Sequence, residues 1–104
     1  MNLSRIEQLL KFLEEDPEDT FSLYALALEY KKSDPSEAER IFNQLLSSYP
    51  DYLPTYYQAA ALLEEKGEFD NALKVYEAGM KVAKEQNDTG TYKELQAAYT
   101  MLLS

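Results

Sequence analysis

The feature that most constrains this chain is an internal repeat of bulky and small residues. Three positions recur thirty-three residues later, Leu23, Leu26 and Tyr30 as Tyr56, Ala59 and Leu63, and two recur thirty-four later, Ala38 and Phe42 as Ala72 and Tyr76. The one-residue difference lies in the turn before Ala38, which is one residue shorter than the turn before Ala72. A period of this length is typical of stacked helix pairs, in which each pair buries its apolar face against the next.

The expected helix ends carry local signals. Two segments have the capping-box pattern, in which a Ser or Thr and a Glu three residues later satisfy free backbone N–H groups: Ser4 with Glu7, and Thr91 with Glu94. Asp34 followed by Pro35 predicts a helix start, and Gly67 predicts a helix end because glycine accepts the left-handed conformation. The chain therefore predicts six helices, near residues 3–15, 19–32, 35–48, 53–66, 69–86 and 91–103.

The two complete copies are flanked by incomplete ones. A weaker third copy begins with Tyr92, Leu95 and Tyr99, and no second helix follows it. We therefore predict a single all-α domain made of a half repeat 3–17, full repeats 20–52 and 53–88, and a capping helix 91–103. Gln96 replaces the small residue of the earlier copies, which indicates that the last helix has a solvated outer face, as repeat arrays need. The two half repeats favour a complete unit.

Small residues are expected wherever two helices approach closely, at about 8–10 Å between axes. Ala27, Ala38, Ala60 and Ala72 occupy such positions, and the aromatic rings of the repeats fill the gaps between them. Gly79 lies in the middle of an expected helix, where glycine costs about 1 kcal/mol relative to alanine. A close helix contact would explain it, and a merely tolerated glycine is the alternative.

Composition excludes several classes of function. The chain contains no His and no Cys, so a disulfide framework, a zinc site and the usual catalytic triads lack their residues. We expect no cofactor, no metal and no enzymatic activity, because no general-base constellation is visible. The net charge of −9 disfavours nucleic acid, whose binding requires Lys and Arg.

Nothing in the sequence predicts a membrane segment. The longest apolar stretch, Gln58 to Leu63, is far shorter than the roughly 18–20 residues that span a bilayer. Polar and acidic residues follow Met1 too soon for a signal peptide. A cytoplasmic location is the default expectation.

The repeat resembles the tetratricopeptide repeat family, as found in small bacterial proteins. The first copy reads Leu23-x-x-Leu26-Ala27-x-x-Tyr30, then Ala38-x-x-x-Phe42 and Pro50, and the second reads Tyr56-x-x-Ala59-Ala60-x-x-Leu63, then Ala72-x-x-x-Tyr76. The closing Pro is Lys84 in the second copy, so we expect the fifth helix to continue to about Gln86. The resemblance implies a right-handed α-solenoid of antiparallel helix pairs that binds other proteins without catalysis.

The family's concave surface is lined mainly by the first helix of each repeat. Carried onto this chain, the resemblance predicts a peptide-binding groove lined by Phe21, Tyr24, Leu28, Lys31, Tyr57, Ala61, Glu64, Lys93 and Ala97. The spacing of +3, +4 and +3 along each helix places every set on one helical face. Pro54, Gly90 and Thr100 complete these sets.

Tyr24 and Tyr57 are thirty-three residues apart and are expected side by side in the groove, with ordinary core packing as the alternative. Some relatives bind a peptide carboxylate with clustered bases, whereas Lys31 and Lys93 are the only inward bases here. A neutral or basic, partly apolar protein or peptide is therefore the expected partner. The other possibility is a weak homodimer that covers the apolar faces of the terminal helices: Ile6, Leu9, Leu10 and Leu13, or Leu95, Leu102 and Leu103.

Overall fold

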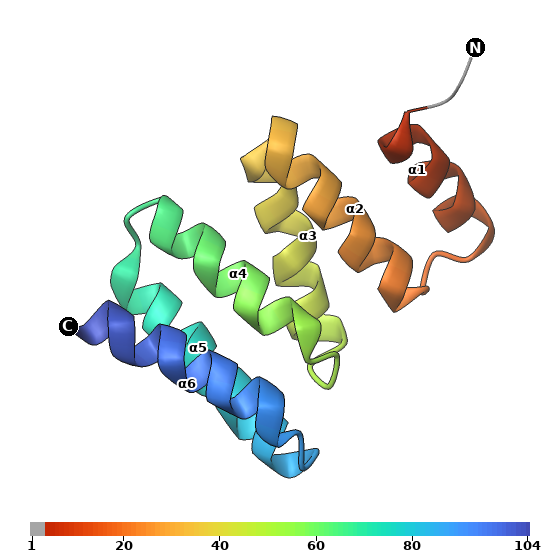
Figure 1. The fold of residues 1–104 in the computed structure, drawn as a ribbon. Coiled ribbons are helices and arrows are strands. Elements are labelled where there is room, and N and C mark those ends of the chain that lie inside the picture. The colour runs from red at the N-terminus through yellow and green to blue at the C-terminus, as the bar shows by residue number, and fades with distance from the viewer. Residues whose placement is uncertain (1–3) are drawn as a thin grey trace. The chain divides into compact units, whose positions relative to one another are not determined.

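The computed structural model describes residues 4–104, and within them the chain forms six α-helices and no strand (Figure 1). The helices are α1 (Arg5–Glu15), α2 (Thr20–Ser33), α3 (Pro35–Ser48), α4 (Pro54–Glu65), α5 (Phe69–Glu85) and α6 (Thr89–Leu103). The predicted helices are confirmed within about two residues at each end. Leu3, the first residue of the first predicted helix, lies outside the described residues.

The chain divides into two compact units, Met1–Tyr52 and Leu53–Ser104. In the first unit, α2 packs against both α1 and α3. The small residues of the repeat pattern, Ala27 on α2 and Ala38 on α3, are both fully buried. Phe42 is buried as well and packs its ring at 6.5 Å from that of Tyr24. This is the arrangement expected of small residues that allow helices to approach and rings that fill the remaining space.

In the second unit, α5 packs against both α4 and α6. The closest approach is at Gly79, which is buried in the middle of α5. A Cβ atom at this position would stand 2.6 Å from the Cβ of Tyr56 on α4 and 3.0 Å from Cδ1 of Leu95 on α6. The predicted close helix contact at Gly79 is therefore confirmed, and it involves two neighbouring helices.

Two of the predicted helix starts are confirmed. At α1, the backbone N–H of Glu7 donates to Oγ of Ser4 at 3.1 Å, and the Glu7 carboxylate accepts from the Ser4 backbone at 3.4 Å. At α3, the Asp34 carboxylate accepts from the backbone N–H of Glu37 at 3.3 Å, and Pro35 occupies the first helical position.

The capping box predicted at Thr91 and Glu94 is wrong. Helix α6 begins two residues earlier, at Thr89, and its cap is Asp88. The Asp88 carboxylate accepts both the backbone N–H of Thr91 at 3.0 Å and its hydroxyl at 2.8 Å. A carboxylate at a helix N-terminus also interacts favourably with the helix dipole, which a hydroxyl cannot match.

The C-terminal ends of α4 and α5 share one hydrogen-bond pattern. Gly67 has a φ of +79° and follows α4, and its backbone N–H donates to the carbonyl of Glu64, as predicted for a left-handed helix end. After α5 the equivalent position is held by Asn87, with a φ of +58°, whose backbone N–H donates to the carbonyl of Lys84. Helix α5 thus continues past Lys84, as expected from the missing proline, and an asparagine ends it in place of a glycine.

Candidate functional site

Helix α2 presents the first set of predicted groove residues. Phe21 is exposed over 66% of its surface, although it is a large apolar side chain. The other three members of the set are partly buried: Tyr24, Leu28 and Lys31. Their spacing places all four on one face of α2, so this face combines an exposed aromatic ring with a partly apolar floor.

The ring of Tyr24 is supported by two other aromatic side chains. Its centroid lies 5.7 Å from that of Tyr52, with a 62° angle between the rings, and 6.5 Å from that of Phe42. Burial, and secondarily the nearby Asp19 carboxylate, raise the pKa of the Tyr52 phenol above its usual range. The Tyr24 ring therefore packs against other rings of the first unit, and part of its side chain stays accessible to solvent.

Helix α4 carries the second set of predicted groove residues. Tyr57 is exposed over 42% of its surface, and Ala61 and Glu64 are partly buried. The ring of Tyr57 meets the ring of Tyr76 on α5 edge-on, with centroids 6.1 Å apart and an interplanar angle of 72°. Edge-to-face geometry at this distance is favourable between aromatic rings.

Tyr76 also contacts Glu64, because its hydroxyl donates a hydrogen bond to the Glu64 carboxylate. Only 1% of the Tyr76 surface is exposed. Burial is the main cause that raises the pKa of the Tyr76 phenol, and the hydrogen bond to Glu64 adds to it. The phenol consequently remains a neutral donor, and it fixes one oxygen of Glu64 on the face that carries Tyr57.

Helix α6 carries the last two predicted groove residues, Lys93 and Ala97, and both are exposed. Gln96 is exposed too, in agreement with the predicted solvated face of this helix. On the buried side of α6, Leu95 is inaccessible to solvent. At the surface, the hydroxyl of Tyr99 donates to the Glu77 carboxylate at 3.0 Å.

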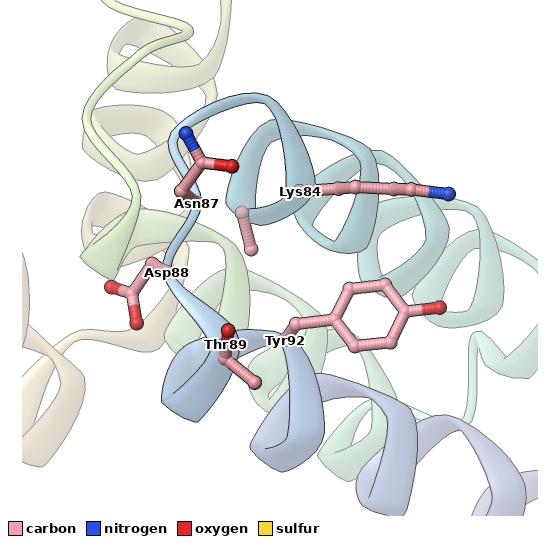
Figure 2. Close-up of a pocket in the computed structure, with 6 residues that line it drawn as sticks. Lys84, Asn87, Asp88, Thr89 and Tyr92 are labelled. Atoms are coloured by element: carbon pink, nitrogen blue, oxygen red, sulfur yellow. The ribbon is translucent and has the colours of Figure 1, made fainter.

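A separate depression of about 350 Å³ lies at the turn between α5 and α6. Figure 2 shows Lys84 and Tyr92 extending to the same side, while the Asp88 carboxylate points to the opposite side. The polar groups do not converge, and Asp88 is occupied as the cap of α6. Among residues 4–104, no three acidic side chains lie close enough together to hold a metal ion. No described helix has the length and apolar character needed to cross a membrane.

Sequence reasoning missed the contact between Tyr76 and Glu64. The two residues are twelve positions apart and belong to different helices, so no local motif joins them. The signal lies in the comparison of the two copies, because Glu64 and Tyr76 stand where the first copy has Lys31 and Phe42. In the second copy Tyr76 replaces the phenyl ring of Phe42, and Glu64 replaces the base Lys31. The two replacements together indicate a polar contact that only the second copy has.

These helix pairs, with small residues at their contacts and part-exposed aromatic rings on their first helices, define a helical-repeat protein. A sequence profile described as tetratricopeptide repeat matches residues 29–99. The chain belongs to the tetratricopeptide repeat family, whose members generally act as protein-interaction modules.

Solved structures that are similar to this chain include the following three. A solution structure of a tetratricopeptide repeat domain protein from Salinibacter ruber is 40% identical, with a TM-score of 0.80 over 84% of this chain and 89% of that one. A crystal structure of a tetratricopeptide repeat domain protein from the same organism is 38% identical, with a TM-score of 0.77 over 82% and 96%. A protein from Bordetella parapertussis has a TM-score of 0.84 over 98% and 90%, at 20% identity, and shows the fold alone. No curated protein matches the chain.

Proposed function

We propose that this protein binds an extended peptide or a helix of a partner through the faces of α2 and α4, without catalysing a reaction. The observation that carries the proposal is the exposure of large apolar side chains on the first helix of each full repeat, above all Phe21 on α2 and Tyr57 on α4. Exposed apolar side chains that gather on the surface of a protein commonly mark a site where a partner binds. Aromatic rings suit this role, since they bury a large area at a small entropy cost.

The expected partner is neutral or basic and partly apolar. The net charge of −9 repels acidic segments, and electrostatic complementarity selects partners mainly by excluding those of like charge. The two predicted inward bases, Lys31 and Lys93, belong to different units. Residues 57–64 of α4 contain no Lys or Arg, so this part of the proposed surface has no basic side chain of its own. Binding is expected to be of micromolar strength, about −8 kcal/mol, because two repeats offer a small surface.

The test is selection of binding peptides from a displayed random library, followed by titration of the selected peptides. Phe21→Ala and Tyr57→Ala should each weaken binding by roughly tenfold, as loss of an aromatic anchor does. Phe69→Ala is the matched control, because Phe69 is also exposed, over 53% of its surface, but begins a second helix, α5. Equal loss in all three variants, or no loss in the first two with helicity preserved, would overturn the groove assignment.

Self-association is the second candidate, and exposed apolar side chains on the terminal helices favour it. Leu10 and Phe12 on α1, and Met101 and Leu103 on α6, are exposed. Two residues that the sequence assigned to these faces do not contribute, since Leu9 and Leu95 are buried within the chain. Sedimentation equilibrium of wild type and of Leu10→Ser tests for a homodimer. A wild-type mass that rises with concentration, together with a monomeric mass for the variant, supports the homodimer. A monomeric mass for wild type at every concentration excludes it.

A further inference from the structure

We propose that Tyr57 and Glu64 form a recognition site for a lysine or arginine side chain of the partner, with Tyr76 as the residue that positions the Glu64 carboxylate. This inference rests on the proposed function, because it names the chemistry that the α4 face would recognise. It concerns the second unit alone, since all three residues lie between Leu53 and Ser104.

The geometry places the aromatic ring of Tyr57 and the carboxylate of Glu64 on one face of α4. Glu64 follows Tyr57 by seven residues, which is two turns of helix and therefore the same side of α4. Tyr76 contacts both: its ring packs edge-on against Tyr57, and its hydroxyl donates to the carboxylate of Glu64. A single buried side chain thus holds the exposed ring and the carboxylate in a fixed relation.

Among the described residues of the second unit, the Glu64 carboxylate has no ion-pair partner. Its described contact there is the hydrogen bond from the Tyr76 hydroxyl, while Lys66 pairs with Glu68 at 3.0 Å. Its hydrogen-bond donor, Tyr76, is a neutral phenol, so the negative charge is oriented but not neutralised. A partly buried carboxylate in this state gains more from an arriving cation than one that is fully solvated.

Charge complementarity selects the occupant. A lysine or arginine has an apolar stem that can lie on the Tyr57 ring and a cation that can reach the carboxylate. An acidic or phosphorylated side chain would be repelled, and a purely apolar one would desolvate Glu64 without compensation. The first copy carries Lys31 and Phe42 at the equivalent positions, so this site is expected in the second copy only.

The experiment uses two small probes and the isotopically labelled full chain. N-acetyl-arginine amide is titrated into the protein and followed by NMR, with the uncharged isostere N-acetyl-citrulline amide as the paired probe. We expect the arginine probe to shift the amide signals around Tyr57 and Glu64, with an affinity at least roughly fivefold above that of citrulline. Glu64→Gln should abolish this preference, while Glu65→Gln, which removes the same charge from the adjacent exposed residue, should retain it.

Tyr76→Phe tests the positioning role. It keeps the ring against Tyr57 and removes only the hydroxyl, so the arginine preference should fall while citrulline binding and the fold of α4 persist. A purely structural role for the hydroxyl would lower the unfolding midpoint and leave the ratio of the two affinities unchanged, which would overturn the positioning role.

Three results would overturn the proposed lysine- or arginine-binding site. The arginine probe could shift signals at acidic residues throughout the chain, it could leave the α4 signals unchanged up to its solubility limit, or Glu65→Gln could lose as much preference as Glu64→Gln. Peptides selected without enrichment of Lys or Arg would also remove this inference and leave the proposed function standing. Conversely, the arginine probe could bind at Glu64 while the library yields no binding peptide. That result would remove the proposed function and leave the lysine- or arginine-binding site standing.

Discussion

Gly79 lies so close to Tyr56 that a methyl group on the glycine would stand 2.6 Å from the tyrosine Cβ. That atom is attached directly to the backbone of α4 and cannot move aside unless the helix moves. An exposed mid-helix glycine gains about 1 kcal/mol of stability on replacement by alanine, whereas forcing atoms into a packed core costs about 1–3 kcal/mol. The second effect is expected to dominate at this position.

We therefore predict that Gly79→Ala lowers the free energy of unfolding by about 1 kcal/mol and that Gly79→Leu lowers it further. Urea denaturation followed by circular dichroism measures both. Ala78→Leu is the control, because Ala78 precedes Gly79 on the same helix but is exposed, and it should change stability by less than about 0.5 kcal/mol. A stabilising effect of Gly79→Ala would show that α4 yields at this contact.

Ser22 and Thr55 occupy equivalent places in the two copies and differ in their hydrogen bonding. Both are buried, and the Ser22 hydroxyl donates to the Asp19 carboxylate at 2.6 Å. The residue three positions before Thr55 is Tyr52, which offers no carboxylate, and Oγ1 of Thr55 has no hydrogen-bond partner. A buried hydroxyl without a partner costs about 1–3 kcal/mol.

Thr55→Val keeps the side-chain shape and removes the unpaired hydroxyl, so we expect it to raise the free energy of unfolding by about 1 kcal/mol. Ser22→Ala should lower it by about 1 kcal/mol, because a made hydrogen bond is lost. Parallel thermal unfolding of the two variants provides the comparison. If both variants were equally destabilised, the Thr55 hydroxyl would have a partner in solution, such as a buried water.

Asn87 and Gly67 end their helices with the same left-handed backbone, but only the glycine adopts it without steric cost. Asn87→Gly should raise stability by about 0.5 kcal/mol, since the left-handed conformation costs about 1–2 kcal/mol for an ordinary residue and somewhat less for asparagine. Gly67→Ala should lower stability by about 1 kcal/mol. Nothing lies within 4 Å of a Cβ atom at Gly67, so this cost isolates the backbone conformation. Gly67→Asn should cost less than Gly67→Ala, and the reverse order of the two unfolding midpoints would contradict this account.

The sequence could predict the helices because their signals are local and repeated. Periodic apolar residues predict each helix, and helix ends are marked by the carboxylate of Asp34 and by the backbone properties of Pro35 and Gly67. The sequence does not settle the start of α6, because Asp88 and Thr91 are both good caps. Only the three-dimensional geometry shows the Asp88 carboxylate accepting from Thr91. The contact between Tyr76 and Glu64 joins two helices across twelve residues, and no local rule reaches that far. The groove residues remain a prediction, because they belong to helices of two separate units.

The cap of α6 gives the final prediction, a pH dependence. Hydrogen bonds from the backbone N–H and hydroxyl of Thr91 lower the pKa of Asp88 below its usual range. Because the folded-state pKa lies below the unfolded one, the cap's contribution is fully present above about pH 4, the ordinary pKa of aspartate, and is lost as pH falls through the folded value. Asp88→Ala should therefore reduce stability at neutral pH, and the difference from wild type should shrink below about pH 4. Denaturation midpoints of both proteins across this pH range measure the difference in stability. Because the other acidic residues are protonated in both proteins alike, their effect cancels in this comparison. A difference that stays constant down to the lowest pH would show that the Asp88 carboxylate does not act as an ionised cap.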